Sequence, residues 1–155
     1  MKIILFALIS LSGSLAFSMP SVGDYVLFSA TVTDNKTQNV VRETIEKEIL
    51  AYNQTKDEFQ EKYTVTVEGK TPESHLLWLG RGHFTTKALV IGAMTVCEGI
   101  NGKRVKVRVP AGKFRACLQD RSNWIAMVPY GLAKYRYNRE NAETVAELVK
   151  YRWGK

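Results

Sequence analysis

The chain has 155 residues, enough for one domain with a single core and too few for two comfortable ones. Its formal net charge is +7, so we expect it to meet anionic surfaces such as lipid head groups readily. No basic repeat interleaved with aromatic residues is present, which argues against a nucleic-acid partner.

The N-terminus has the pattern of a secretory signal peptide, which we assign to residues 1–18. Lys2 provides a cationic start, a short apolar run follows, and Ala16 and Ser18 fit a small-residue processing site. The run is far shorter than the roughly 20 residues that a membrane-spanning helix needs. We expect cleavage near Ser18 and a single soluble β-rich domain over residues 19–155, periplasmic or secreted and without a transmembrane anchor.

Export decides how the two cysteines are interpreted. Cys97 and Cys117 are the only cysteines of the chain, and an even count in an oxidising compartment favours a disulfide over two buried free thiols. A loop of this length, closed by a disulfide, would stabilise the fold by about 3 kcal/mol in the chain-entropy model. We therefore predict a Cys97–Cys117 crosslink.

The first half of the domain has the alternating pattern of strands. The predicted strands cover residues 24–33, 58–67 and 75–79. Residues 39–52 are ambiguous, because Val41, Ile45 and Ile49 fit one face of a helix and one face of a strand equally well. We favour a strand there, since a hairpin-like turn leads from it into a clear partner strand.

The pattern changes to helical spacing over residues 85–97. Thr85 or Thr86 can cap a helix, the apolar stripe reaches Cys97, and Gly99 stands where a helix C-cap favours glycine. The spacing predicts one short helix with Cys97 on its last turn.

Strand patterns return in the second half of the chain. The predicted strands cover residues 103–109, 114–118, 124–127, 132–138 and 144–153. The total of eight or nine strands and one helix describes an α+β domain that consists mainly of antiparallel β-sheet.

Catalytic and metal-binding patterns are absent from the sequence. His75 and His83 are separated by eight residues, and nothing in their spacing makes them converge on a metal with a carboxylate. The chain has no G-x-S-x-G elbow, no C-x-x-C pair and no phosphate-binding loop. We expect no enzyme, no metal and no cofactor. The triplets at Asn35 and Asn53 are N-glycosylation sequons only if the source glycosylates its secreted proteins.

The densest basic segment lies on one face of the predicted strand 103–109. Arg104, Lys106 and Arg108 alternate with valines there, and they are candidates for an anion-binding surface. The alternative, which we favour, is that they keep the sheet from pairing edge to edge with other copies.

Aromatic residues are numerous for a small domain. Trp78, Phe84, Trp124 and Tyr130 are candidates to line a cavity for an apolar ligand, since a curved antiparallel sheet can wrap such side chains around one. Most aromatic residues at strand spacing belong to the core, so a core without a cavity is the competing interpretation.

One combination of residues resembles a known group of proteins. It comprises Cys97, Gly102, Val109-Pro-Ala-Gly112, Phe114, Cys117, Trp124 and Val128-Pro-Tyr-Gly131. This combination looks like that of a group of uncharacterised exported bacterial proteins, whose sheet is similar to the curved half-barrel of the periplasmic lipoprotein carriers and their outer-membrane receptor. The resemblance implies a half-barrel that can hold acyl chains. The chain differs from those carriers in its shorter length, its single predicted helix and its basic strand face.

Together these observations predict an exported, non-enzymatic protein. We expect it to bind a lipid, a lipopeptide or an envelope protein on the concave face of its sheet, with Arg104, Lys106 and Arg108 meeting an anionic head group or membrane surface. The alternative is a structural or protein-interaction module of the cell envelope, whose core is filled by its own side chains.

Overall fold

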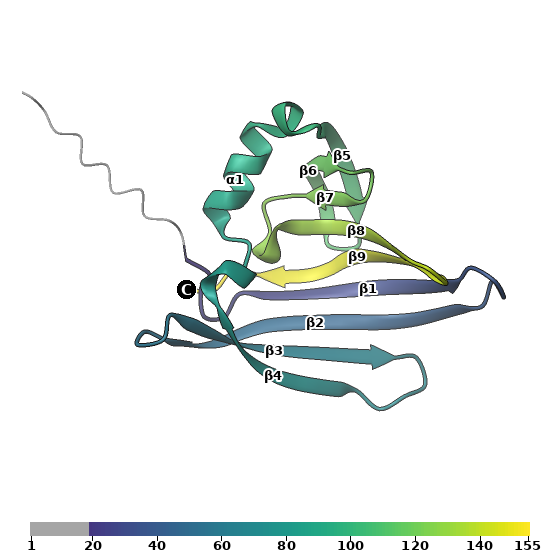
Figure 1. Cartoon of the computed structure of the whole chain (residues 1–155), viewed down its shortest axis with the longest axis horizontal. Helices are drawn as coiled ribbons and strands as arrows, with labels where there is room; N and C mark the ends of the chain where they lie inside the picture. The colour runs from purple at the N-terminus through teal and green to yellow at the C-terminus, as the bar shows by residue number, and fades with distance from the viewer. Residues whose placement is uncertain (1–18) are drawn as a thin grey trace, which may run out of the picture.

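The computed structural model describes residues 19–155, and the predicted signal peptide lies outside them. The described residues form nine strands, one α-helix and three short 3₁₀ helices (Figure 1). The strands are β1 (Tyr25–Asp34), β2 (Val40–Asn53), β3 (Glu58–Val67), β4 (Glu73–Gly80), β5 (Lys103–Val109), β6 (Gly112–Gln119), β7 (Asn123–Ile125), β8 (Leu132–Arg139) and β9 (Ala142–Arg152). The helices are η1 (Arg81–His83), α1 (Lys87–Thr95), η2 (Cys97–Ile100) and η3 (Pro129–Gly131). These elements confirm an antiparallel, mainly β fold.

All nine strands belong to one open sheet with the order β4-β3-β2-β1-β9-β8-β7-β6-β5. Every neighbouring pair is antiparallel, and the chain termini of the domain meet where β1 pairs with β9. Figure 1 shows β1 to β4 running side by side, while β5 and β6 are turned steeply against them. β4 and β5 are therefore the two edges of the sheet.

The ambiguous segment 39–52 is a strand. It forms most of β2, which pairs with β1 on one side and with β3 on the other. As a strand, this segment forms hydrogen bonds to neighbours on both sides and buries Ile45 and Ile49 on one face. These interactions outweigh the weak helix preference that its spacing indicates.

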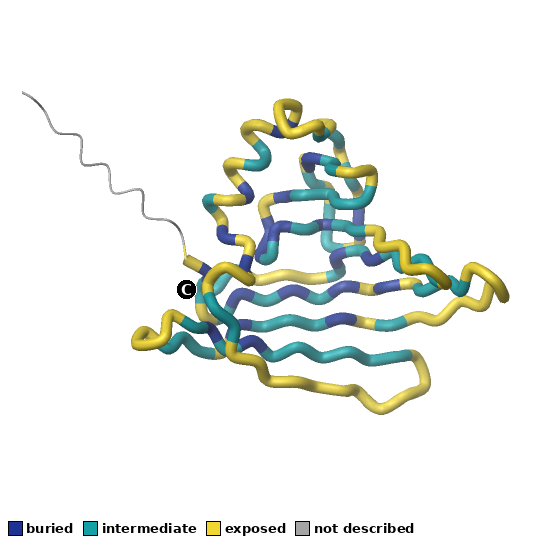
Figure 2. Tube along the Cα trace, viewed as in Figure 1, coloured by how far each residue is buried: buried dark blue, intermediate teal, exposed yellow. Residues whose placement is uncertain are grey.

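The main core lies on one face of the central strands. Val26, Phe28 and Ala30 are buried and alternate along β1 with more exposed residues. Figure 2 shows buried and more exposed positions alternating along the central strands. Leu148 of β9 and Ile45 of β2 stand directly opposite Phe28 in the sheet. This packing across three strands explains why the apolar positions of β1 repeat with a period of two.

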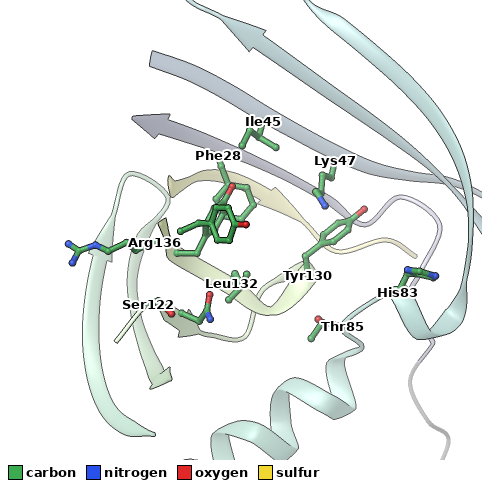
Figure 3. A pocket seen from close by; sticks show the side chains of 12 residues that line it. Phe28, Ile45, Lys47, His83, Thr85, Ser122, Tyr130, Leu132 and Arg136 are labelled. Atoms are coloured by element: carbon green, nitrogen blue, oxygen red, sulfur yellow. The ribbon is translucent and has the colours of Figure 1, made fainter. Parts of the chain in front are cut away.

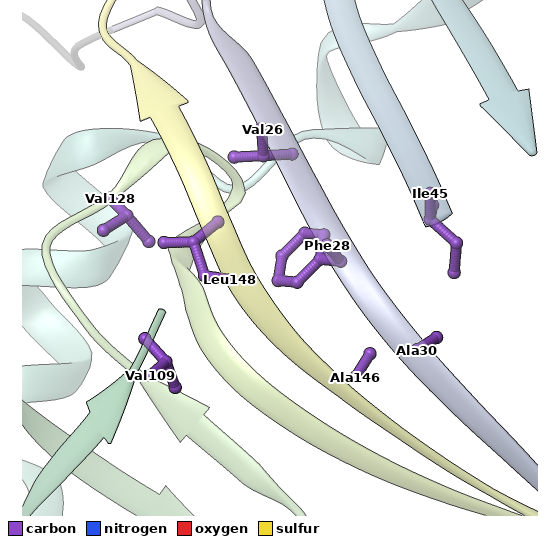
Figure 4. Packing of buried hydrophobic residues seen from close by; sticks show 8 residues of the cluster. All are labelled: Val26, Phe28, Ala30, Ile45, Val109, Val128, Ala146 and Leu148. Carbon is purple, nitrogen blue, oxygen red and sulfur yellow. The ribbon is translucent and has the colours of Figure 1, made fainter. Parts of the chain in front are cut away.

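The β5–β6 hairpin folds back onto this core. The backbone N–H of Ala111, in its turn, donates to the carbonyl of Leu148 at 2.9 Å. Val109 packs with Val128 and Leu148 beside β1, as Figure 4 shows. The Pro-Ala-Gly turn thus brings the far end of the sheet into contact with its centre.

The predicted helix is present but ends early. Thr86 caps α1, with its hydroxyl accepting from the N–H of Leu89 at 3.3 Å. The helix ends at Thr95, so the prediction of Cys97 on its last turn is wrong. The chain tightens into η2 instead, and Asn101 rather than Gly99 takes the left-handed conformation that ends the segment (φ 58°).

The predicted disulfide is confirmed. Cys97 in η2 and Cys117 in β6 are both fully buried and bonded to each other, with their Cα atoms 5.6 Å apart. Gly102 lies against this bond: a Cβ there would approach the Cys117 sulfur to 2.5 Å and the Cys97 sulfur to 2.8 Å. Only glycine leaves room for the turn to pass over the disulfide. Within the part of the chain that the structure describes, no helix is long and apolar enough to cross a bilayer.

Candidate functional site

A hollow of about 440 Å³, here called the central hollow, opens between β1, β2 and the β7–β8 region (Figure 3). Its lining residues are Phe28, Ile45, Lys47, His83, Thr85, Ser122, Asn123, Tyr130, Leu132, Tyr135, Arg136 and Tyr137. Its basic residues are Lys47, His83 and Arg136, and no carboxylate belongs to the lining. Ligand pockets of small molecules span about 300–1,000 Å³, so the size is appropriate for one.

The apolar wall of the central hollow continues the main core. Phe28 and Ile45 face each other across β1 and β2, and the ring of Tyr135 meets that of Phe28 edge to face with centroids 5.5 Å apart. Burial raises the pKa of Tyr135 to about 12, with smaller contributions from Tyr63 and Glu43. Tyr135 therefore presents a neutral ring to the hollow at physiological pH.

The polar wall is formed by Lys47, which occupies a core-facing position of β2. Its ammonium lies 5.3 Å from the ring centroid of Tyr63 and 5.5 Å from that of Tyr130, so it faces two aromatic rings. Glu61 of β3 is buried behind it, and the closest approach of the two charged groups is 3.9 Å. This distance is longer than a hydrogen bond and leaves the lysine with donor capacity toward the hollow.

Tyr130 is held in an unfavourable conformation. Its backbone is left-handed (φ 61°), which is rare for a bulky residue and costs roughly 1–3 kcal/mol. Its buried hydroxyl makes no hydrogen bond of normal geometry among residues 19–155. Burial first, and then the charge of Glu61, raise its pKa far above the ordinary value, so the phenol stays protonated. Strain of this kind is typical of functional positions.

Gly131 locks this turn against the helix. Its φ is +74°, and a Cβ there would approach the side chains of Thr85 and Val90 to 2.8 Å and 3.1 Å. The turn that carries Tyr130 is consequently fixed between α1 and β8.

A second hollow, here called the helix hollow, lies under α1 and has a volume of about 470 Å³. It is lined by Thr85, Leu89, Val90, Ala93, Gln119, Asn123, Ile125, Tyr130, Gly131 and Leu132, of which none is charged. Thr85, Asn123, Tyr130 and Leu132 line both hollows. The two spaces therefore adjoin, one with a lysine in its wall and the other without any charge.

The predicted basic surface lies elsewhere, on the β5–β6 hairpin. We call the side chains Lys106 and Arg108 of β5 and Lys113 and Arg115 of β6 the cationic face. In the register of the hairpin, Lys106 stands opposite Arg115, and Arg108 opposite Lys113. Like charges at opposite positions destabilise a sheet. Within residues 19–155 none of the four forms an ion pair, and they surround a separate hollow of about 380 Å³ with Val107 and Phe114.

Among residues 19–155, Arg104 forms contacts with the helical segment that Lys106 and Arg108 of the same strand do not form. Its guanidinium donates to the carbonyl of Thr95 at 3.0 Å and lies 3.6 Å from the carboxylate of Glu98. A cation at the end of a helix compensates its free carbonyls. Arg104 thus joins β5 to the end of α1, while Lys106 and Arg108 are exposed.

Of the four aromatic residues predicted to line a cavity, the structure places Tyr130 in the central hollow. Phe84 is buried in a cluster with Phe59, next to Tyr130. Trp124 packs on the alanine-rich cluster of the sheet and beneath Lys134. Trp78 lies on edge strand β4 and is 47% exposed, and it lines neither hollow.

Five residues of the central hollow are not among those predicted from the sequence: Phe28, Ile45, Lys47, Leu132 and Tyr135. A usable signal was present for one of them: Lys47 follows Ile45 and precedes Ile49 on the odd-numbered face of β2. A lysine at a core-facing strand position needs a partner or a ligand, since burying an unpaired charge is costly. The others follow ordinary core spacing and carry no such mark.

The two histidines lie in different places. His83 in η1 lines the central hollow, and His75 is exposed on β4 and lines neither hollow. Residues 19–155 contain no group of three or more His, Cys, Asp or Glu side chains that could hold a metal ion. The turns at Asn35 and Asn53 are both outside the hollows.

Comparison with known proteins adds no family assignment. No protein-family model matches the chain, and no curated protein matches its sequence. The candidate function therefore rests on the geometry of the hollows and the cationic face.

Proposed function

We propose that this chain is an exported, non-enzymatic protein that binds an apolar or amphiphilic ligand, such as a lipid or lipopeptide, on the concave face of a curved half-barrel sheet. The observation that carries the proposal is the pair of adjoining hollows, which share four lining residues. Export is supported by the signal-peptide pattern of residues 1–18 and by the Cys97–Cys117 disulfide, which is typical of oxidising compartments.

The walls of the hollows favour binding over catalysis. Half of the residues that line the central hollow are aliphatic or aromatic, and the helix hollow is lined mainly by apolar residues, as in pockets that hold an amphiphilic ligand. Tyr130 is kept at the junction of both hollows despite its strained backbone. Strained backbone conformations cluster at binding sites, which supports a role for this tyrosine in the pocket.

An anionic membrane surface is the partner that we propose for the cationic face. Its four side chains repel each other across the hairpin and have no carboxylate partner within residues 19–155, so a polyanionic surface would relieve that repulsion. Because these side chains do not line the central hollow, the anion-binding role predicted for Lys106 and Arg108 becomes one of docking to a surface. Arg104, tied to α1, would contribute less.

Uptake of the fluorescent dye Nile red tests the proposed pocket. The dye should become fluorescent with the native protein, and Ser122→Trp, which fills the central hollow, should reduce uptake severalfold. Thr31→Trp is the matched control, because Thr31 is exposed on the opposite face of β1. It should bind dye as the native protein does.

Mass spectrometry of lipids extracted from the protein, purified from the envelope of the cells that export it, gives the second readout. A copurifying lipid that is lost in Ser122→Trp supports the proposal. If no lipid copurifies and the two tryptophan variants take up dye equally, the hollows are not a ligand site, and the alternative of a structural or protein-interaction module stands.

A further inference from the structure

The two adjoining hollows differ in charge. The central hollow has Lys47, His83 and Arg136 in its wall and no carboxylate, whereas the helix hollow has no charged residue at all. A ligand that lies across both therefore meets a cation at one end and only neutral side chains at the other.

Lys47 is the basic residue best placed to act on such a ligand. Arg136 already pairs with Glu143 at 3.2 Å and is exposed, and His83 is exposed as well. Lys47 is about two-thirds buried, since 34% of its side chain is accessible. In Figure 3 its ammonium points into the space beside Tyr130. An ion contact there is shielded from water and is worth more than one at the surface.

Glu61 lies close to this lysine without neutralising it fully. Its carboxylate is 6% exposed and lies 3.9 Å from the ammonium, behind the wall of the hollow. The ring faces of Tyr63 and Tyr130 hold the ammonium from two further sides. The cation is thereby fixed at the wall with hydrogen-bond donors to spare.

From this arrangement we infer that the ligand is an amphiphile with an acidic head group, which is bound by Lys47 in the central hollow while its acyl tail runs into the helix hollow under α1. The inference rests on the proposed function, since it names the class of ligand for the same pocket. It also assigns the helix hollow to the tail: Leu89, Val90, Ala93 and Ile125 supply its apolar surface.

Displacement of Nile red by laurate and by dodecanol tests this inference. The two probes have the same tail, and only laurate carries an acidic head. Laurate should displace the dye at a concentration at least tenfold lower than dodecanol, as is typical when one hydrogen bond to a charged group is added. Lys47→Met should remove most of this advantage and leave displacement by dodecanol unchanged.

Two further variants separate the head from the tail. Glu61→Gln removes the competing carboxylate and should strengthen laurate binding. Ala93→Trp, which fills the helix hollow, should weaken laurate and dodecanol alike, whereas Ile91→Trp at an exposed position of the same helix should weaken neither. Should Lys47→Met fail to fold, Lys47→Met/Glu61→Gln carries the same test without leaving a buried charge unpaired.

The possible results distinguish this inference from the proposed function. If neither probe displaces the dye, the pocket itself is refuted. If both displace it equally in the native protein, the pocket stands and the acidic head group is refuted. A native preference for laurate that survives in Lys47→Met/Glu61→Gln would refute the role of Lys47.

Discussion

The two ends of the sheet differ in how their charged side chains are paired. In the long-strand half, β1 to β4, and in the segments that border it, oppositely charged side chains meet. Lys47 of β2 pairs with Glu61 of β3, Asp57 of the β2–β3 turn with Arg81 of η1 at 2.8 Å, and Glu48 of β2 with Arg152 of β9 at 2.7 Å. In the β5–β6 hairpin, the four side chains of the cationic face stand opposite one another without an acid.

The two ends also differ in how deeply their apolar side chains are buried. In the long-strand half, Phe59 is fully buried, stacks on Tyr52 and meets Phe84 edge to face. In the hairpin, Val105 and Val107 are only half-buried, and the disulfide and Gly102 secure its base. The long-strand half is thus built for stability, whereas the hairpin carries charge that its own packing does not require. This difference is what we expect if the hairpin docks to the anionic membrane surface that we propose as its partner.

Truncating one aromatic residue should break the long-strand half. Phe59→Ala removes a side chain that is 1% exposed, and we expect a loss of about 3–5 kcal/mol in the free energy of unfolding. Val107→Ala in the hairpin should cost about 1 kcal/mol, because the side chain is only partly buried. Urea denaturation measures both. Equal losses would contradict the difference in packing between the two ends.

Removing the disulfide should loosen the hairpin end. Cys97 and Cys117 are 20 residues apart, and Cys97→Ala/Cys117→Ala should lower the free energy of unfolding by about 3 kcal/mol. Hydrogen exchange should rise first in η2 and β5, while β2 and β3 stay protected. In the native protein both thiols should resist alkylation until a reductant is added; alkylation without reductant would refute the crosslink in solution.

Neutralising the cationic face tests whether its charge serves a membrane. Lys106→Gln/Arg115→Gln should weaken binding to phosphatidylserine vesicles by about 2 kcal/mol, or roughly thirtyfold, because each cation near an anionic membrane contributes about 1 kcal/mol. Sedimentation with vesicles measures this, and the binding should fall with added salt. Lys62→Gln/Lys70→Gln is the control with the same change of net charge in β3 and the turn after it. If both pairs weaken binding equally, net charge rather than the hairpin attracts the protein.

Much of the fold could be predicted from the sequence, because strand spacing is a local signal. The strands 58–67 and 103–109 were predicted with the bounds they have in the structure, and the valines of β5 point away from its cations as expected. The end of α1 could not be predicted, since the disulfide and the turn over Gly102 tighten the chain after Thr95 into η2.

The site was harder to predict than the fold. A hollow forms between strands that are far apart in sequence, so the spacing within any one strand cannot define it. Tyr130 is one of the four aromatic residues predicted to line a cavity, and it does line the central hollow. Phe28 and Ile45 look like any core residues in sequence, and Trp78 lies on the outer edge, because the sheet order places β4 last. Lys47 carries a recognisable signal, a charge among core positions, and Glu61, between Phe59 and Tyr63 on the same face of β3, carries the same signal.

The smallest predicted effect compares the two ends by removing one positive charge from each. Arg115→Gln removes a charge that stands opposite Lys106, and it should stabilise the protein by about 0.2–1 kcal/mol. Lys62→Gln removes a charge that stands opposite Glu48, and it should destabilise the protein by a similar amount. Both changes lower the net charge equally, so a general charge effect would shift both variants in the same direction. Urea denaturation measures the change in the free energy of unfolding of each variant. Changes of opposite sign at low salt that become equal at high salt would show that like charges repel in the hairpin and opposite charges attract in the long-strand half.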